Sequence, residues 1–205
     1  MTKDSEKKIM PPCIIACNVF RSAMEHLGIR QRYPDLTLRY LPAHLHLQPV
    51  ELRRRLLAEI DAARKLNQPV GCLYGHCFED IEDILEKAGV PRIRTGHCFE
   101  ILMGGDRYRR SIQDQAGTFF MEKELVENFE DYCWDPLELH DPQMRRWYFE
   151  HYRRVAYIRQ PHDPDLTDQA QRIAGALDLE LQILEADYKE LELALNQLIG
   201  ELYTR

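Results

Sequence analysis

The sequence predicts an α/β protein with Rossmann-like, three-layer architecture, in which helices flank a mostly parallel sheet. Segments that read as strands alternate with segments that read as helices along nearly the whole chain, which is the pattern of parallel strands joined by helical crossovers. Several predicted strands are short and continuously apolar, as expected for strands buried on both faces. No linker, low-complexity segment or break in composition divides the 205 residues. We expect one α/β domain over 11–205, preceded by a flexible segment over 1–10.

The first third of the chain contains two predicted strands and two predicted helices. A continuous apolar run predicts a strand at 13–20, and a short helix follows at 21–27 before a glycine. Alternation of apolar residues predicts a strand at 36–41, which stops before a proline. A proline at the first position and apolar residues at helical spacing predict a helix at 49–65.

Glycines end most of the predicted elements in the middle of the chain. The apolar segment 69–74 predicts a strand, and 79–88 predicts a helix with one apolar face. A weaker strand is expected at 90–94, followed by two helices at 99–103 and 106–113. The later segments continue the alternation: strands at 117–121, 155–158 and 179–184, and helices at 123–132, 141–152, 166–177 and 188–203.

Composition and charge exclude several classes of protein. The 27 Lys and Arg against 34 Asp and Glu give a net charge of −7, which argues against a nucleic-acid-binding protein. No apolar run approaches the roughly 20 residues of a membrane-spanning helix, and the charged start of the chain is unlike a signal peptide. We therefore expect a soluble, cytoplasmic protein that binds neither nucleic acid nor membrane; a homo-oligomer is compatible with the sequence.

A repeated pentapeptide is the most informative feature of the sequence. Gly75-His76-Cys77-Phe78-Glu79 recurs as Gly96-His97-Cys98-Phe99-Glu100. Each copy follows a predicted strand and opens a predicted helix, so the two copies predict two similar turns side by side in the sheet. Because open α/β sheets bind ligands beyond the carboxyl ends of their strands, both copies are expected at a ligand-binding edge.

Cysteine and histidine gather at these predicted strand ends. The end of the first predicted strand lies near Cys17, and the two pentapeptides supply Cys77 and the pair His97-Cys98. Thiolate and imidazole together suit zinc, iron or an iron-sulfur cluster. The sequence therefore predicts a transition-metal or cluster site held by Cys17, Cys77, His97 and Cys98. Three further histidines are open candidates: His44, His46 and His76, of which the first two are expected to point to opposite sides of an extended segment.

Two other functions compete with metal binding. Cys77 and Cys98 each stand at a predicted helix N-terminus, where the helix dipole lowers a thiol pKa, so either could serve a thiol-dependent enzyme. Alternatively, the chain is a metal-free module that binds a protein partner or a cofactor, with the acidic closing helix as docking surface. The remaining cysteines, Cys13, Cys72 and Cys133, are expected to be buried structural residues. Motifs for dinucleotides, P-loop nucleotides, hydrolase nucleophiles and zinc proteases are absent.

From about Ile14 to Leu195 the chain resembles the bacterial and archaeal domain-of-unknown-function family 1638. The resemblance is carried by six motifs: Ile14-Ile15-Ala16-Cys17, Leu41-Pro42-Ala43-His44-Leu45-His46, Tyr74-Gly75-His76-Cys77, Gly96-His97-Cys98-Phe99-Glu100, Gly117-Thr118-Phe119-Phe120 and Tyr152-Arg153-Arg154-Val155-Ala156-Tyr157-Ile158-Arg159-Gln160. It implies that Cys17, Cys77, His97 and Cys98 belong to one shared feature.

The resemblance brings no established activity. It implies a context near corrinoid-dependent methyl transfer, hence a protein partner in a cofactor or methyl-transfer system. Two departures stand out: His76 and Phe78 replace an Asp and a Gly of the family pattern, and Glu122-Lys123 stands where the family usually has Thr-Asp. The first departure makes His76 a weaker candidate ligand and leaves Cys77 in place.

Overall fold

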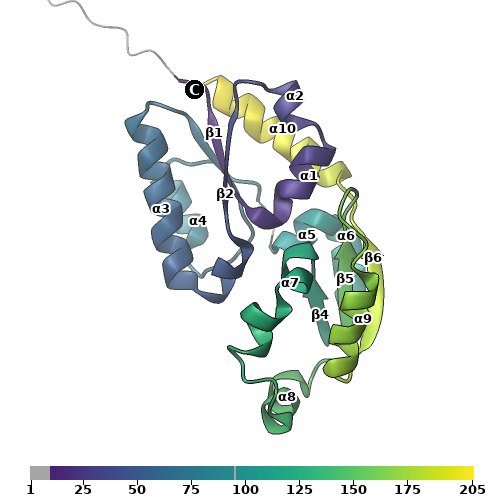
Figure 1. The fold of residues 1–205 in the computed structure, drawn as a ribbon. Coiled ribbons are helices and arrows are strands. Elements are labelled where there is room, and N and C mark those ends of the chain that lie inside the picture. Colours follow the sequence, from purple (N-terminus) through teal and green to yellow (C-terminus); the bar gives the residue numbers. More distant parts are fainter. Residues whose placement is uncertain (1–9, 95) are drawn as a thin grey trace, which may run out of the picture. The chain divides into compact units, whose positions relative to one another are not determined.

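The computed structural model describes residues 10–94 and 96–205, which form two compact units (Figure 1). Unit 1 contains the described residues up to Arg94 together with Glu192–Arg205, and unit 2 contains the described residues from Gly96 to Leu191. Each unit is built around its own three-stranded, all-parallel sheet. The predicted α/β class with parallel strands flanked by helices is confirmed, with the strands divided between two sheets.

In unit 1 the strand order is β2-β1-β3. The chain runs from the central strand outward to β2 and then crosses to β3 on the other side, so helix α3 lies on one face and α1 and α10 on the other (Figure 1). The elements are β1 (Cys13–Cys17), a 3-10 helix (Asn18–Phe20), α1 (Arg21–His26), α2 (Ile29–Arg32), β2 (Thr37–Leu41), a 3-10 helix (Ala43–Leu47), α3 (Pro49–Lys65), β3 (Val70–Leu73), α4 (Ile81–Lys87) and most of α10 (Lys189–Tyr203).

Apolar burial explains the elements of unit 1. Every residue of β1 is buried, which fits a central strand covered on both faces. Helix α3 begins with Pro49 and buries Leu52, Leu56, Ile60 and Ala63, which recur at helical spacing. A Cβ on Gly71 would lie 2.9 Å from Cδ1 of Leu202. The absence of a side chain at this position of β3 therefore lets α10 pack closely against the sheet.

In unit 2 the strand order is β4-β5-β6. The elements are α5 (Cys98–Met103), α6 (Gly105–Asp114), β4 (Thr118–Met121), α7 (Lys123–Glu127), a π-helix (Glu130–Trp134), α8 (Pro142–Phe149), β5 (Arg154–Arg159), α9 (Thr167–Ala176) and β6 (Glu180–Glu185). Strand β5 is the centre of the sheet and is buried except at Arg159, its last residue.

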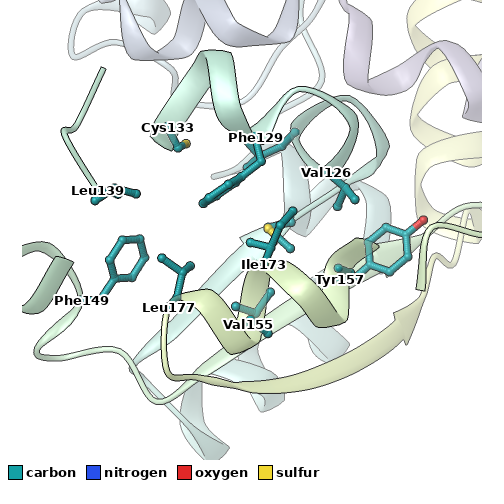
Figure 2. Close-up of a cluster of buried hydrophobic side chains, with 13 residues drawn as sticks. Val126, Phe129, Cys133, Leu139, Phe149, Val155, Tyr157, Ile173 and Leu177 are labelled. Carbon is teal, nitrogen blue, oxygen red and sulfur yellow. The ribbon is translucent and has the colours of Figure 1, made fainter. Parts of the chain in front are cut away.

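A hydrophobic cluster of unit 2 joins the sheet to its α7 and α9 side. Figure 2 shows Val155 and Tyr157 of β5 with Ile173 and Leu177, which belong to α9 and its C-cap. The ring of Phe119 meets those of Phe129, Phe149 and Tyr152 edge-on, at centroid distances of 5.4–6.5 Å. On the other side of the sheet, Phe120 contacts the rings of Phe99 and Tyr108.

Three expected elements differ from the structure. The strand over 13–20 ends at Cys17, because the next three residues form a 3-10 helix. The weak strand over 90–94 is wrong, since Arg92 forms only an isolated bridge to Cys72. The helix over 123–132 breaks after Glu127 and is followed by the π-helix.

The single domain over 11–205 stays a prediction. The flexible segment expected over 1–10 lies outside the described residues except for Met10, whose backbone N–H donates to the carbonyl of Asn67. Across the residues that the structure describes, no helix has the length and apolar character to cross a membrane.

Candidate functional site

The carboxyl edge of the unit 1 sheet has the geometry of a ligand-binding edge. The direction in which strands are added reverses at β1, so the carboxyl ends of β1 and β3 flank a topological switch point, where open α/β sheets bind their ligands. The parallel register places Ala16 opposite Leu73, and Cys17 is therefore level with Tyr74. Cys77 follows three residues after Tyr74, in the turn beyond the end of β3.

The two thiols at this edge differ in accessibility. Cys17 is 6% exposed, whereas Cys77 is partly exposed. The N–H of Cys77 donates to the carbonyl of Gly75 at 2.9 Å, which folds the chain back directly after β3. Phe78 is buried next to it and anchors this turn in the core. The turn therefore holds an accessible thiol on the same edge that carries Cys17.

The ring of His76 contacts two charged side chains, those of Arg92 and Glu82. Its Nε2 lies 2.8 Å from Nη2 of Arg92 and 3.0 Å from Oε1 of Glu82. Arg92 also pairs with Glu82, and hydrogen bonds from His76 and Arg92 lower the pKa of the Glu82 carboxyl. The ring of His76 thus contacts both members of the Arg92–Glu82 ion pair.

His44 and His46 lie beyond the end of β2, but not on an extended segment. Residues Ala43–Leu47 form a 3-10 helix, so the expectation that the two rings point to opposite sides of an extended chain is wrong. Nδ1 of His46 lies 2.7 Å from the carbonyl oxygen of Ala43, within its own turn. That local contact occupies one nitrogen of the His46 ring.

The second pentapeptide lies in unit 2. His97 is the N-cap residue of α5, and the partly exposed Cys98 is the first residue of that helix. The carboxylate of Glu100 accepts the N–H of Gly96 at 2.9 Å and so closes the turn before the helix. The ring of His97 lies 6.0 Å from that of Tyr108 on α6. The four predicted metal ligands are therefore contributed in pairs, two by each unit.

Within residues 10–94 and 96–205, no group of three or more His, Cys, Asp or Glu side chains is placed to hold a metal ion.

The six cysteines form no disulfide. Cys13, Cys72 and Cys133 are buried, as expected for structural residues. Burial raises the pKa of Cys13 and of Cys133 to about 11, and it raises the pKa of Cys72 as well. These three thiols stay protonated at neutral pH.

Sequence reasoning missed a buried polar group at the carboxyl edge of the unit 2 sheet. Glu122 follows β4, is 4% exposed, and accepts the N–H groups of Glu124 and Leu125 at 2.8 and 3.1 Å. Burial raises its pKa to about 7. After β5 and β6, the Tyr188 hydroxyl donates to Oε1 of Gln160 at 2.8 Å. The position of Glu122 directly after an apolar strand was the available signal.

The fold and its strand-end groups define an α/β protein with parallel sheets and polar carboxyl edges. The chain belongs to the family described as protein of unknown function (DUF1638), whose model matches residues 40–195. Cys77, His97 and Cys98 lie inside the matched range, and Cys17 precedes it. No curated protein and no solved structure matches the chain.

Proposed function

We propose that this protein binds a soft transition-metal ion at the carboxyl edge of the unit 1 sheet, with Cys17 and Cys77 as thiolate ligands. The observation that carries the proposal is the placement of the two cysteines at the topological switch point: Cys17 is the last residue of β1, and Cys77 lies beyond the end of the adjacent parallel strand β3. Of the other cysteines of unit 1, Cys13 is the first residue of β1 and Cys72 lies before the last residue of β3. Cys17 and Cys77 are therefore the cysteines of this unit at the carboxyl edge.

The chemistry of the two side chains selects the class of metal. Thiolates favour zinc, iron and copper(I) over magnesium and calcium. A structural zinc site needs four protein ligands, more than this edge offers, so two thiolates leave coordination positions for other groups. An ion with open positions can activate a thiol or accept a methyl-bearing substrate. This agrees with a role in thiol or corrinoid-linked methyl-group metabolism.

Metal stoichiometry of the full chain tests the proposal. Protein purified anaerobically and loaded separately with zinc and iron(II) is expected to keep about one equivalent after gel filtration. Cys17→Ala and Cys77→Ala should each lose it. Cys13→Ala, at the opposite end of β1, should retain it and serves as matched control. A wild-type protein without metal, or one whose metal survives both substitutions, would overturn the proposal.

Two further variants ask whether the predicted ligands of unit 2 take part. His97→Ala and Cys98→Ala should leave zinc content unchanged if the unit 1 thiols bind the ion with external ligands. Loss of zinc in these variants as well would contradict binding by the two unit 1 thiols alone. The thermal unfolding midpoint of every variant separates loss of metal from loss of fold.

A thiol-dependent activity at Cys77 is the second candidate function. Cys77 is partly exposed while the other three cysteines of unit 1 are buried, so it is the thiol of this unit that reagents reach. A catalytic Cys77 is expected to react with iodoacetamide along a pH profile whose midpoint falls well below the ordinary thiol pKa of about 8.5. A midpoint at or above that value would exclude this function.

A further inference from the structure

Unit 2 contains a cavity of about 290 Å³ that is open to solvent and is lined by side chains of α6, β5 and β6 and by Met103, the last residue of α5. Helix α6 contributes four residues to it at the spacing of a single helix face: Arg107, Arg110, Ser111 and Asp114. Arg154 of β5 and Gln182 of β6 face the same space. The volume lies at the small end of the range for pockets that bind small molecules.

The two sides of α6 have different surroundings. Tyr108 packs against Phe120 of β4, with ring centroids 5.4 Å apart, so this side of the helix covers the sheet. The side that lines the cavity carries arginine and serine instead of apolar residues. The polar side of a surface helix commonly faces solvent, and Arg110 and Asp114 are exposed. What sets this side apart is the cavity that it shares with Arg154 and Gln182.

The positive charges of the cavity are only partly neutralised. Arg154 is fully engaged, because its Nε donates to Oγ1 of Thr118 and its two terminal nitrogens reach Asp114 and Ser111 at 2.8–3.0 Å. Arg107 approaches Asp187 only at 4.0 Å. Arg110 has no ion pair with any residue that the structure describes. The lining carries three arginines and one aspartate, and Asp187 beside Arg107 offsets part of the remaining charge, so the cavity keeps an excess of positive charge.

The side chain of Gln182 is a second, independent indication of a ligand. Its Oε1 is buried and has no hydrogen-bond partner among the described residues. A buried acceptor without a partner costs free energy, and a ligand that donates a hydrogen bond removes this cost. The arginines favour an anionic ligand, and Gln182 favours a hydrogen-bond donor next to the anionic group.

We infer that this cavity binds a small phosphate monoester that carries a neighbouring hydroxyl group. The phosphate is held by Arg107, Arg110 and the hydroxyl of Ser111, and the ligand hydroxyl donates to Oε1 of Gln182. A phosphate monoester has a charge of about −1.5 to −2 at neutral pH, which is complementary to the excess positive charge. The guanidinium fork pairs with phosphate oxygens in two parallel hydrogen bonds.

Calorimetric titration of the full chain with glycerol 3-phosphate tests the inference. The wild-type protein is expected to bind one equivalent. Arg107→Gln and Arg110→Gln should each weaken the affinity at least tenfold. Arg109→Gln removes the same charge from the same helix at a residue that pairs with Asp106 and lies outside the cavity lining, and it should change affinity less than twofold.

Two comparisons identify the ligand class. Gln182→Leu should abolish the preference for glycerol 3-phosphate over inorganic phosphate, because only the former has an alcohol hydroxyl beside the phosphate that can reach Oε1 of Gln182. Malate, a hydroxylated dianion without phosphate, should bind at least tenfold more weakly than glycerol 3-phosphate. Absence of wild-type binding, equal binding of malate, or equal losses in Arg109→Gln and Arg110→Gln would each overturn the inference.

Discussion

Arg154 and Thr118 are register partners on neighbouring strands, and Nε of Arg154 donates to Oγ1 of Thr118 at 2.8 Å. The remaining nitrogens of the same guanidinium reach Asp114 and Ser111 near the end of α6. One buried cation thus ties this helix to the β4–β5 pair. The side chain of Arg154 is 10% exposed and that of Asp114 is 73% exposed, so the two ends of the ion pair lie in different dielectric environments.

Replacing Arg154, the buried partner of this ion pair, should lower the stability of the protein. Arg154→Met is expected to lower the free energy of unfolding by about 2–4 kcal/mol, because it breaks a hydrogen-bonded network inside the fold. Asp114→Asn should cost less than about 1 kcal/mol, because an exposed carboxylate contributes little. Urea unfolding of both variants measures the difference, and equal losses would contradict the assignment of Arg154 as the structural anchor.

Glu122 should make stability depend on pH. Its folded-state pKa of about 7 lies above the ordinary value of 4.5 because burial disfavours the charged carboxylate. The folded protein therefore keeps a proton that the unfolded chain releases, and this stabilisation is present below pH 4.5 and lost as pH rises through 7. The full effect is about 3 kcal/mol. Urea unfolding at pH 5.5 and 8 should show falling stability in the wild type and a smaller fall in Glu122→Gln.

Two glycines of unit 2 should respond in opposite directions to alanine. A Cβ on Gly117 would lie 2.2 Å from the backbone oxygen of His151, and backbone atoms cannot move aside cheaply. Gly117→Ala should therefore destabilise the protein by more than about 2 kcal/mol. Gly175 lies in α9 with open space around it, so Gly175→Ala should stabilise by up to about 1 kcal/mol. Thermal unfolding compares the two, and equal shifts would contradict the packing described.

Five of the six cysteines should separate into two groups on alkylation of the native protein. Cys77 and Cys98 are partly exposed, while Cys13, Cys72 and Cys133 are buried with raised pKa values. Brief treatment with iodoacetamide at pH 8, followed by peptide mass spectrometry, should modify the first group at least tenfold faster. Fast modification of Cys13 or Cys72 would mean that the β1–β3 core opens readily.

Local signals in the sequence predicted most helices and strands. Pro49 and the apolar spacing after it gave the bounds of α3, and the apolar runs before Gly75 and after Ala116 gave β3 and β4. The division into two sheets was not predictable in this way, because alternating strands and helices are equally compatible with one sheet or two. Arg92 shows the same limit, since its single bridge depends on a neighbouring strand and not on local propensity.

The candidate sites were predictable to different degrees. Cys17 and Cys77 could be located because strand ends and uncommon residue types are visible in the sequence. The two pentapeptides looked equivalent, yet they lie in different units and only the first directly follows a strand of the described sheets. The arginine cavity was missed because it needs Gln182 of β6 beside α6, and that proximity arises from the fold. The polar spacing of Arg107, Arg110 and Ser111 was its only local signal.

X-ray absorption spectroscopy of the zinc-loaded protein tests the central claim, metal binding by Cys17 and Cys77, most directly. The account predicts sulfur scatterers at about 2.3 Å from the zinc. The sulfur shell should be absent in Cys77→Ala, which is expected to lose the ion, and it should be unchanged in Cys13→Ala. A zinc shell made only of nitrogen and oxygen at about 2.0–2.2 Å would contradict thiolate ligation at this edge of the sheet.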